Sequence, residues 1–190
     1  DFTTISEWTI SAKGDRQGTR NMRQSSWVKY EADLSAYAGQ EVYVAIRHFD
    51  CTDQYFLDID DIAIPTSKKE NAKRGNNSKG LRASYGFESG DEGWTTINAN
   101  GDDHTWYHNT MAGDHSVLSA DSHTGTGHMM SESYCNATWM SIEPDDYLVS
   151  PEKYTIGTNA EFKFWACAQD ANYPSEHFGV AISTAGNTSA

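Results

Sequence analysis

Carboxylates in the segment 55–64 offer the clearest chemistry in this chain. The segment has the composition of a β-strand, in which alternate side chains point to the same face. If Ile62 and Ile64 face a hydrophobic core, Asp60 points to the same side. A buried carboxylate without a partner is strongly unfavourable, so the sequence predicts that something neutralises Asp60.

Two kinds of partner fit Asp60. A neighbouring arginine such as Arg47 could form an ion pair with it. Alternatively, an oxygen-coordinated Ca²⁺ could bind Asp60 together with Glu88, with Asp61 assisting. The residues alone leave both interpretations open.

A second candidate calcium loop follows at Asn98, Asn100 and Asp102, which are spaced like positions 1, 3 and 5 of a calcium-binding loop. Two of these three side chains are amides, and Asp103 stands where a turn glycine is common. Fewer charges predict a weaker or empty second site.

Five of the seven histidines lie close together in the chain, and a transition metal or haem could use such a group. They are His104, His108, His115, His123 and His128. The surrounding glycine, serine and threonine instead favour solvated loop histidines, which is the interpretation we prefer. We find no nucleophile elbow, P-loop, dinucleotide fingerprint or zinc-protease motif, so the sequence predicts no catalytic activity.

Four aromatic residues in loop-rich sequence could form an exposed platform for a ligand: Trp94, Trp106, Tyr107 and Trp139. Aromatic side chains beside strands also commonly pack in the core. A planar row of exposed rings would favour a sugar ligand, and its absence would favour a protein ligand.

The elements that must position these residues are predicted to be strands. The 190 residues include six Trp, ten Tyr, seven Phe and fifteen Gly, a composition that favours strands and turns. Residues 28–34 alternate apolar and polar side chains, whereas 42–49 is nearly continuously apolar, as in a central strand. Similar patterns at 161–167 and 178–182 predict an all-β fold of the β-sandwich or jelly-roll class.

Charge and hydropathy exclude two kinds of partner. A net charge of -13 argues against binding to nucleic acid, which requires basic surfaces. A mean hydropathy of -0.68, without a long apolar run, predicts that no helix inserts in a membrane.

One segment, 66–83, departs from this composition. Its 18 residues hold six basic side chains and one acid, with glycine and asparagine between them. It has almost nothing to bury, so we predict a flexible basic linker between residues 1–65 and 84–190.

Both flanks of this linker carry a family resemblance. After the linker, the chain contains GFESG (86–90), GWTTINANGDDHTW (93–106), SESY (131–134), PDDYLVSP (144–151), FWACAQDANY (164–173) and EHFGV (176–180). Before it, the chain contains DLSAYAG (33–39), RHF (47–49), CTD (51–53) and IDDI (59–62). As a set, these motifs resemble the cleaved adhesin domains of gingipain-type proteases and related haemagglutinins.

The order of the motifs is cyclically shifted relative to that family. The resemblance makes residues 1–65 the C-terminal-half strands of an adhesin-type jelly roll, and residues 84–190 its N-terminal-half strands. We expect the two pieces to form one domain, as a monomer or as a domain-swapped dimer. Modules of this family commonly hold a structural calcium, so the resemblance favours Ca²⁺ at Asp60.

The resemblance implies a non-catalytic adhesin or haemagglutinin module, secreted or on the bacterial cell surface, with a role in virulence. Its expected partners are host extracellular proteins or glycans, with contact to haem or haemoglobin as a further expectation. The alternative function is a calcium-braced carbohydrate-binding module that stacks sugar rings on Trp or Tyr.

Overall fold

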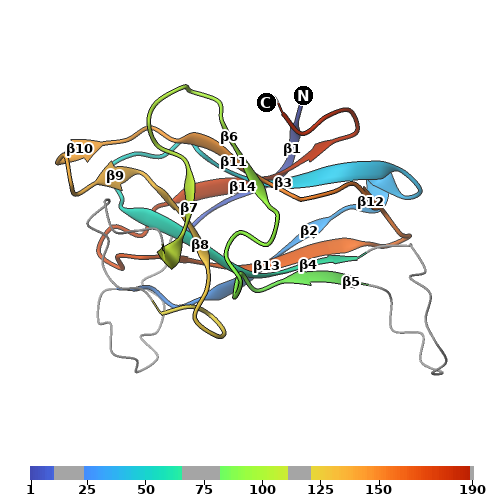
Figure 1. Cartoon of the computed structure of the whole chain (residues 1–190), viewed down its shortest axis with the longest axis horizontal. Helices are drawn as coiled ribbons and strands as arrows, with labels where there is room; N and C mark the ends of the chain where they lie inside the picture. The colour runs from blue at the N-terminus through green and yellow to red at the C-terminus, as the bar shows by residue number, and fades with distance from the viewer. Residues whose placement is uncertain (11–23, 66–81, 111–120, 189–190) are drawn as a thin grey trace.

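Two antiparallel β-sheets pack face to face in the computed structural model of the chain (Figure 1). The structure describes residues 1–10, 24–65, 82–110 and 121–188. The prediction of an all-β sandwich is confirmed.

Sheet A has the strand order β1-β14-β3-β11-β6, and β12 pairs with β3. Its strands are β1 (Thr3–Thr9), β14 (His177–Ser183), β3 (Glu41–Phe49), β11 (Asp145–Val149), β6 (Thr95–Asn98) and β12 (Tyr154–Thr155).

Sheet B has the order β2-β13-β4-β8-β7, and β5 pairs with β4. Its strands are β2 (Val28–Asp33), β13 (Glu161–Ala168), β4 (Phe56–Pro65), β8 (Met129–Glu132), β7 (Trp106–His108) and β5 (Arg82–Tyr85). A short hairpin of β9 (Tyr134–Cys135) and β10 (Met140–Ser141) projects at one end of the sandwich, and a 3₁₀ turn, η1, covers Ser35–Tyr37.

The hydrophobic core lies between the sheets and explains the strand patterns. In β3, Val42, Val44 and Ile46 are fully buried in this core. The alternate residue Ala45 belongs to a smaller cluster with Tyr147, on the other face of sheet A. Because β3 lies between β14 and β11 and is covered on both faces, it is the central strand that its continuous apolar sequence predicts.

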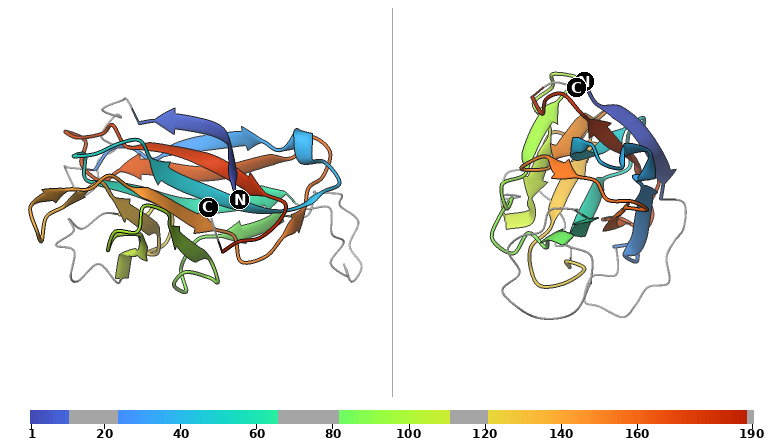
Figure 2. Two further views of the ribbon diagram at one scale, coloured as in Figure 1. Left: turned by 90° about the horizontal axis from the view of Figure 1, so that it is seen from above. Right: turned by 90° about the vertical axis from the view of Figure 1, so that its right-hand side faces the viewer.

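Both sheets combine strands from before and after the segment 66–81. The first and last strands, β1 and β14, pair antiparallel, with Thr3 opposite Ile182. In sheet B, β13 lies between β2 and β4 (Figure 2). The predicted linker lies outside the described residues up to position 81, and β5 begins at Arg82.

Among the described residues, no helix is long and apolar enough to span a bilayer.

Candidate functional site

A β-bulge in β4 determines where Asp60 points. The pairing of β13 with β4 shifts register between Lys163 and Trp165, and Asp61 adopts a left-handed conformation with φ of 49°. The bulge inserts one residue, so Ile59 and Ile62 both face the core although they are three positions apart. Asp60 therefore points to the outer face of sheet B, and the prediction that it shares a face with Ile62 and Ile64 is wrong.

Asp60 is nevertheless fully buried, because residues 121–128 cover this part of sheet B. Its carboxylate accepts hydrogen bonds from the backbone N–H of Asp61 at 2.6 Å and of Thr124 at 3.1 Å. Burial raises the pKa of Asp60 to about 6. Arg47 is not its partner, since Arg47 lies in sheet A and pairs with Asp145 at 2.7 and 3.0 Å.

Asp61 and Glu88 bind the same covering loop. Asp61 Oδ2 lies 2.5 Å from His123 Nδ1, and its Oδ1 accepts from Thr124 Oγ1 at 2.9 Å. Glu88 accepts from the backbone N–H of Thr126 at 3.0 Å and of Gly127 at 3.1 Å, which lowers the pKa of Glu88. We call Asp60, Asp61, Glu88 and residues 121–128 the loop-covered region.

Two glycines allow the covering loop to pass close to Phe87 and Glu88. A Cβ atom at Gly125, where φ is +59°, would lie 2.1 Å from Glu88 Oε1, and a Cβ at Gly127 would lie 2.0 Å from the carbonyl oxygen of Phe87. The three carboxylates supply the oxygen donors that Ca²⁺ prefers, and both oxygens of Glu88 already accept two hydrogen bonds each. Within the described part of the chain, however, they are not among the groups whose three candidate ligand atoms lie within 4.8 Å of one another.

The second candidate calcium loop forms a tight turn at the end of β6. Asn98 donates to the carbonyl oxygen of Asp102 and, at 2.9 Å, to that of His104, and its Oδ1 accepts from the N–H of Gly101 at 2.7 Å. Asp102 Oδ1 accepts from the N–H of His104 at 2.7 Å, and Asn100 donates to Asp102 Oδ2 at 2.9 Å. We call residues 98–104 the asparagine loop.

Asp146 adds a buried carboxylate to the asparagine loop and was not identified from the sequence. It pairs with Asn98 across β11 and β6, so the two side chains share a face. Among the described residues, neither of its carboxylate oxygens has a hydrogen-bond partner, and burial, followed by the charge of Asp102, raises its pKa to about 8. Because Leu148 faces the core, the alternation of β11 would have revealed Asp146.

The predicted aromatic platform is largely part of the interior. Trp94 and Trp106 are each 3% exposed and belong to the main core, so they cannot offer their rings to a ligand. Tyr107 packs against a cluster that contains Tyr55 and Met130. For Trp106 the correction follows from period-two alternation in β7, which points Trp106 inward and Tyr107 outward from sheet B.

Trp139 is different, because its side chain is 80% exposed. It lies in the turn of the β9–β10 hairpin and adopts φ of 59°, a left-handed conformation that is costly for a bulky residue. Met140, 60% exposed, follows it directly.

A polar pocket of about 280 Å³ lies at the base of this hairpin. It is lined by Asp53, Gln54, Tyr55, Tyr134, Asn136, Asp170 and Tyr173. Tyr173 is 56% exposed, and Asn136 Nδ2 donates to the hydroxyl of Tyr55 at 2.6 Å. We call Trp139, Met140, Tyr173 and this pocket the hairpin surface. Apart from Trp139, these residues carry no signal in the sequence, since loop contacts leave no periodic pattern.

The clustered histidines have separate partners. His104 Nδ1 lies 2.5 Å from Glu132, His108 Nε2 lies 2.7 Å from the carbonyl oxygen of Phe87, and His128 Nδ1 lies 2.9 Å from Ser122 Oγ. His108 and His128 are buried, so the expectation of solvated loop histidines is wrong for them. His115 lies outside the described residues.

The comparison with known protein families identifies the domain. The sequence model of the Cleaved Adhesin Domain matches residues 1–64 and 81–190. The chain belongs to the Cleaved Adhesin Domain family. The match is to the adhesin domain that gingipains and hemagglutinins share and not to a protease domain, so this cleaved adhesin domain is a non-catalytic adhesion module.

Several curated proteins of Porphyromonas gingivalis are similar to this cleaved adhesin domain. A Lys-gingipain and Gingipain R1 are each 34% identical over 189 residues, which is 98% of this chain. A Hemagglutinin A is 26% identical over 243 residues, covering 82% of this chain. The chain spans only 10–11% of the length of these relatives. No solved structure matches the chain.

Proposed function

We propose that this adhesin domain binds host extracellular proteins through the hairpin surface and acts in the secreted or cell-surface setting of its relatives. The observation that carries the proposal is Trp139, a large apolar side chain that is 80% exposed at φ of 59°. A strained, solvated tryptophan costs stability, and central aromatic residues commonly carry the binding energy of protein interfaces.

The chemistry around Trp139 indicates the kind of partner. Asp53 and Asp170 give the pocket an acidic lining beside the apolar Met140 and Tyr173. A partner that presents a lysine or arginine among apolar side chains would match this surface in charge and hydrophobicity. We propose the same protein–protein contact for haemoglobin, in place of haem binding by histidine. The described members of the histidine cluster already have separate partners.

A carbohydrate-binding function is the second candidate, and the polar pocket favours it. Asn136 and Gln54 offer amides and Tyr173 offers a partly exposed ring, which are groups that bind sugar hydroxyls and faces. Among the described residues, the large exposed apolar side chains are Val28, Trp139, Met140 and Tyr173, and Val28 lies in β2, away from the hairpin. We therefore favour a protein ligand.

We also propose that Ca²⁺ stabilises the domain at two places. In the loop-covered region, Asp60, Asp61 and Glu88 would supply carboxylate oxygens to one ion. In the asparagine loop, Asn98, Asn100 and Asp102 would act together with Asp146, whose carboxylate oxygens have no described hydrogen-bond partner. The ions would brace the fold rather than take part in a reaction.

Binding assays on the intact chain test the function. The immobilised domain is exposed to a panel of host plasma and matrix glycoproteins with haemoglobin included, and in parallel to a glycan array. We expect saturable binding to a protein that survives enzymatic removal of its glycans. Binding to a defined oligosaccharide alone would replace the adhesin proposal by the carbohydrate-binding one.

A further inference from the structure

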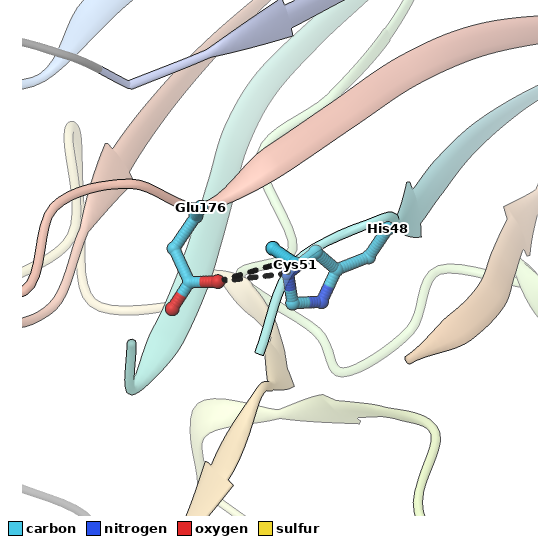
Figure 3. A group of neighbouring side chains, drawn as sticks. All are labelled: His48, Cys51 and Glu176. Atoms are coloured by element: carbon cyan, nitrogen blue, oxygen red, sulfur yellow. Dashed lines mark hydrogen bonds and ion pairs between the residues drawn. The ribbon is translucent and has the colours of Figure 1, made fainter. Parts of the chain in front are cut away.

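Three side chains with different donor atoms meet at one end of the sandwich (Figure 3). His48 is in β3, Cys51 follows the end of that strand, and Glu176 directly precedes β14. The left-handed conformation of Asp50, with φ of 51°, turns the chain between His48 and Cys51. Because His48 pairs with Phe178 across β3 and β14, the sheet itself brings Glu176 to the same place.

The distances among the three donor atoms form a small triangle. His48 Nε2 lies 2.9 Å from Glu176 Oε2 and 3.2 Å from Cys51 Sγ, and Cys51 Sγ lies 3.5 Å from Glu176 Oε2. Tetrahedral zinc with ordinary Zn–N, Zn–S and Zn–O bonds separates its ligand atoms by about 3.3–3.6 Å. The triangle therefore needs to expand by only a few tenths of an ångström to hold such an ion.

The second polar atom of each buried side chain, which is not part of the triangle, is already held by hydrogen bonds. His48 Nδ1 lies 2.8 Å from Ser131 Oγ, and Glu176 Oε1 accepts from the N–H of Tyr55 at 2.9 Å and from Ser133 Oγ at 3.0 Å. Metal-binding histidines and carboxylates characteristically have such outer partners, which orient the ligand atom toward the ion. His48 and Glu176 are fully buried, whereas Cys51 is partly exposed and offers a route from solvent.

We infer that His48, Cys51 and Glu176 form a binding site for Zn²⁺ or a similar borderline transition-metal ion. The ion takes the lone pair of His48 Nε2, with the ring proton on Nδ1 toward Ser131. The thiol of Cys51 releases its proton to solvent and binds as a thiolate, and Glu176 binds through Oε2. Three protein ligands leave the fourth tetrahedral position for water. The nitrogen and sulfur donors separate this site from the all-oxygen calcium regions.

The consequence is structural. His48 and Cys51 belong to the part of the chain before residue 66, and Glu176 belongs to the part after residue 81. A bound ion would cross-link these two parts at the end of β3 and β14, and it would stabilise the folded state.

Cobalt provides the probe, because a Co²⁺–thiolate bond has a charge-transfer absorption that identifies the sulfur ligand. The reduced, metal-free chain is titrated with Co²⁺ in excess Ca²⁺, so that the oxygen sites are filled. We expect one equivalent to give tetrahedral Co²⁺ bands with thiolate charge transfer, and Zn²⁺ to abolish them by displacement. A folded chain without these bands would overturn the inference.

Three cysteine variants locate the ion. C51S should abolish the charge-transfer band and weaken Zn²⁺ binding at least tenfold, whereas C167S should leave both unchanged. C135S is the sharper control, because His104, Glu132 and Cys135 form a second group with the same donor types. If C135S abolishes the band and C51S does not, the ion binds there and our assignment is wrong.

A measurement on the unmodified chain covers the case in which C51S fails to fold. We expect Zn²⁺ to protect Cys51 from alkylation, as mapped by mass spectrometry, while the alkylation rates of Cys135 and Cys167 stay unchanged. Equal alkylation of Cys51 with and without Zn²⁺ would contradict the site.

Discussion

The loop-covered region and the hairpin surface use their side chains in opposite ways. In the loop-covered region, polar groups are bonded to one another, as the buried Asp60 is to the N–H groups of Asp61 and Thr124. At the hairpin surface, the apolar Trp139 and Met140 are exposed to solvent. Burial of well-bonded polar groups holds a structure together, whereas an exposed strained aromatic side chain costs stability unless a partner covers it. The comparison separates residues for folding from residues for binding.

The largest effect on stability is expected from Asp60→Ala. The variant removes the buried carboxylate that accepts hydrogen bonds from the N–H groups of Asp61 and Thr124, so the free energy of unfolding should fall by about 3 kcal/mol. Urea unfolding of the variant and of the natural chain measures this difference in free energy. Asp103→Ala, at an exposed position, is the control and should change stability little. Equal losses in both variants would show that the loop-covered region does not stabilise the fold.

Calcium removal should have the next largest effect. Ca²⁺ at a hundred times its dissociation constant adds about 2.7 kcal/mol to the native state. For a domain of this size, a chelator should lower the melting temperature by about 5–10 °C. Asp146→Asn should remove most of this response, because the Asp146 carboxylate has no described hydrogen-bond partner to replace the ion.

Glu88→Gln is the matched variant for the calcium site proposed in the loop-covered region. Backbone N–H groups already bind Glu88, so its loss should reduce the calcium response less than the loss of Asp146. A response that disappears in Glu88→Gln and persists in Asp146→Asn would place the calcium dependence in the loop-covered region.

Acid should weaken the loop-covered region through His128. Burial lowers the pKa of His128 to about 4, below its ordinary value of 6.5, so between these pH values the unfolded chain binds more protons than the folded one. The contribution of neutral His128 to the free energy of unfolding is complete above pH 6.5 and is lost as the pH falls toward 4. The loss between pH 7 and pH 5 should be about 2 kcal/mol.

His128→Phe tests this assignment, because it keeps a ring beside Trp27 and cannot gain a proton. Chemical unfolding at pH 7 and pH 5 should give a smaller difference for the variant than for the natural chain. The carboxylates with raised pKa values are present in both proteins, so the comparison isolates His128. Identical pH dependence would exclude His128 as the acid-sensitive group.

The sequence predicts the strands better than the positions of single side chains. Alternation and apolar runs correctly indicate β2, β3, β13 and β14, because burial on one face or both acts on every residue of a strand. Asp60 was placed on the wrong face because one inserted residue at Asp61 reverses the alternation, and a bulge has no periodic signal.

The candidate sites depend on contacts between distant segments, which periodicity does not encode. The loop 121–128 reaches Asp60, Asp61 and Glu88 from other parts of the chain. Trp94 and Trp106 lie in sequence with loop composition, yet packing between the sheets buries them. Of the predicted aromatic platform, Trp139 is strongly exposed, and its conformation became visible only in the structure.

Replacing Trp139 by glycine tests most directly whether the hairpin surface binds rather than stabilises. Glycine adopts φ of 59° without strain, so Trp139→Gly should keep the free energy of unfolding within about 1 kcal/mol of the natural chain. We expect binding to the host protein found in the panel to fall at least tenfold, while Val28→Thr, at an exposed apolar position in β2, keeps full affinity. Unchanged binding by a folded Trp139→Gly chain would contradict the account.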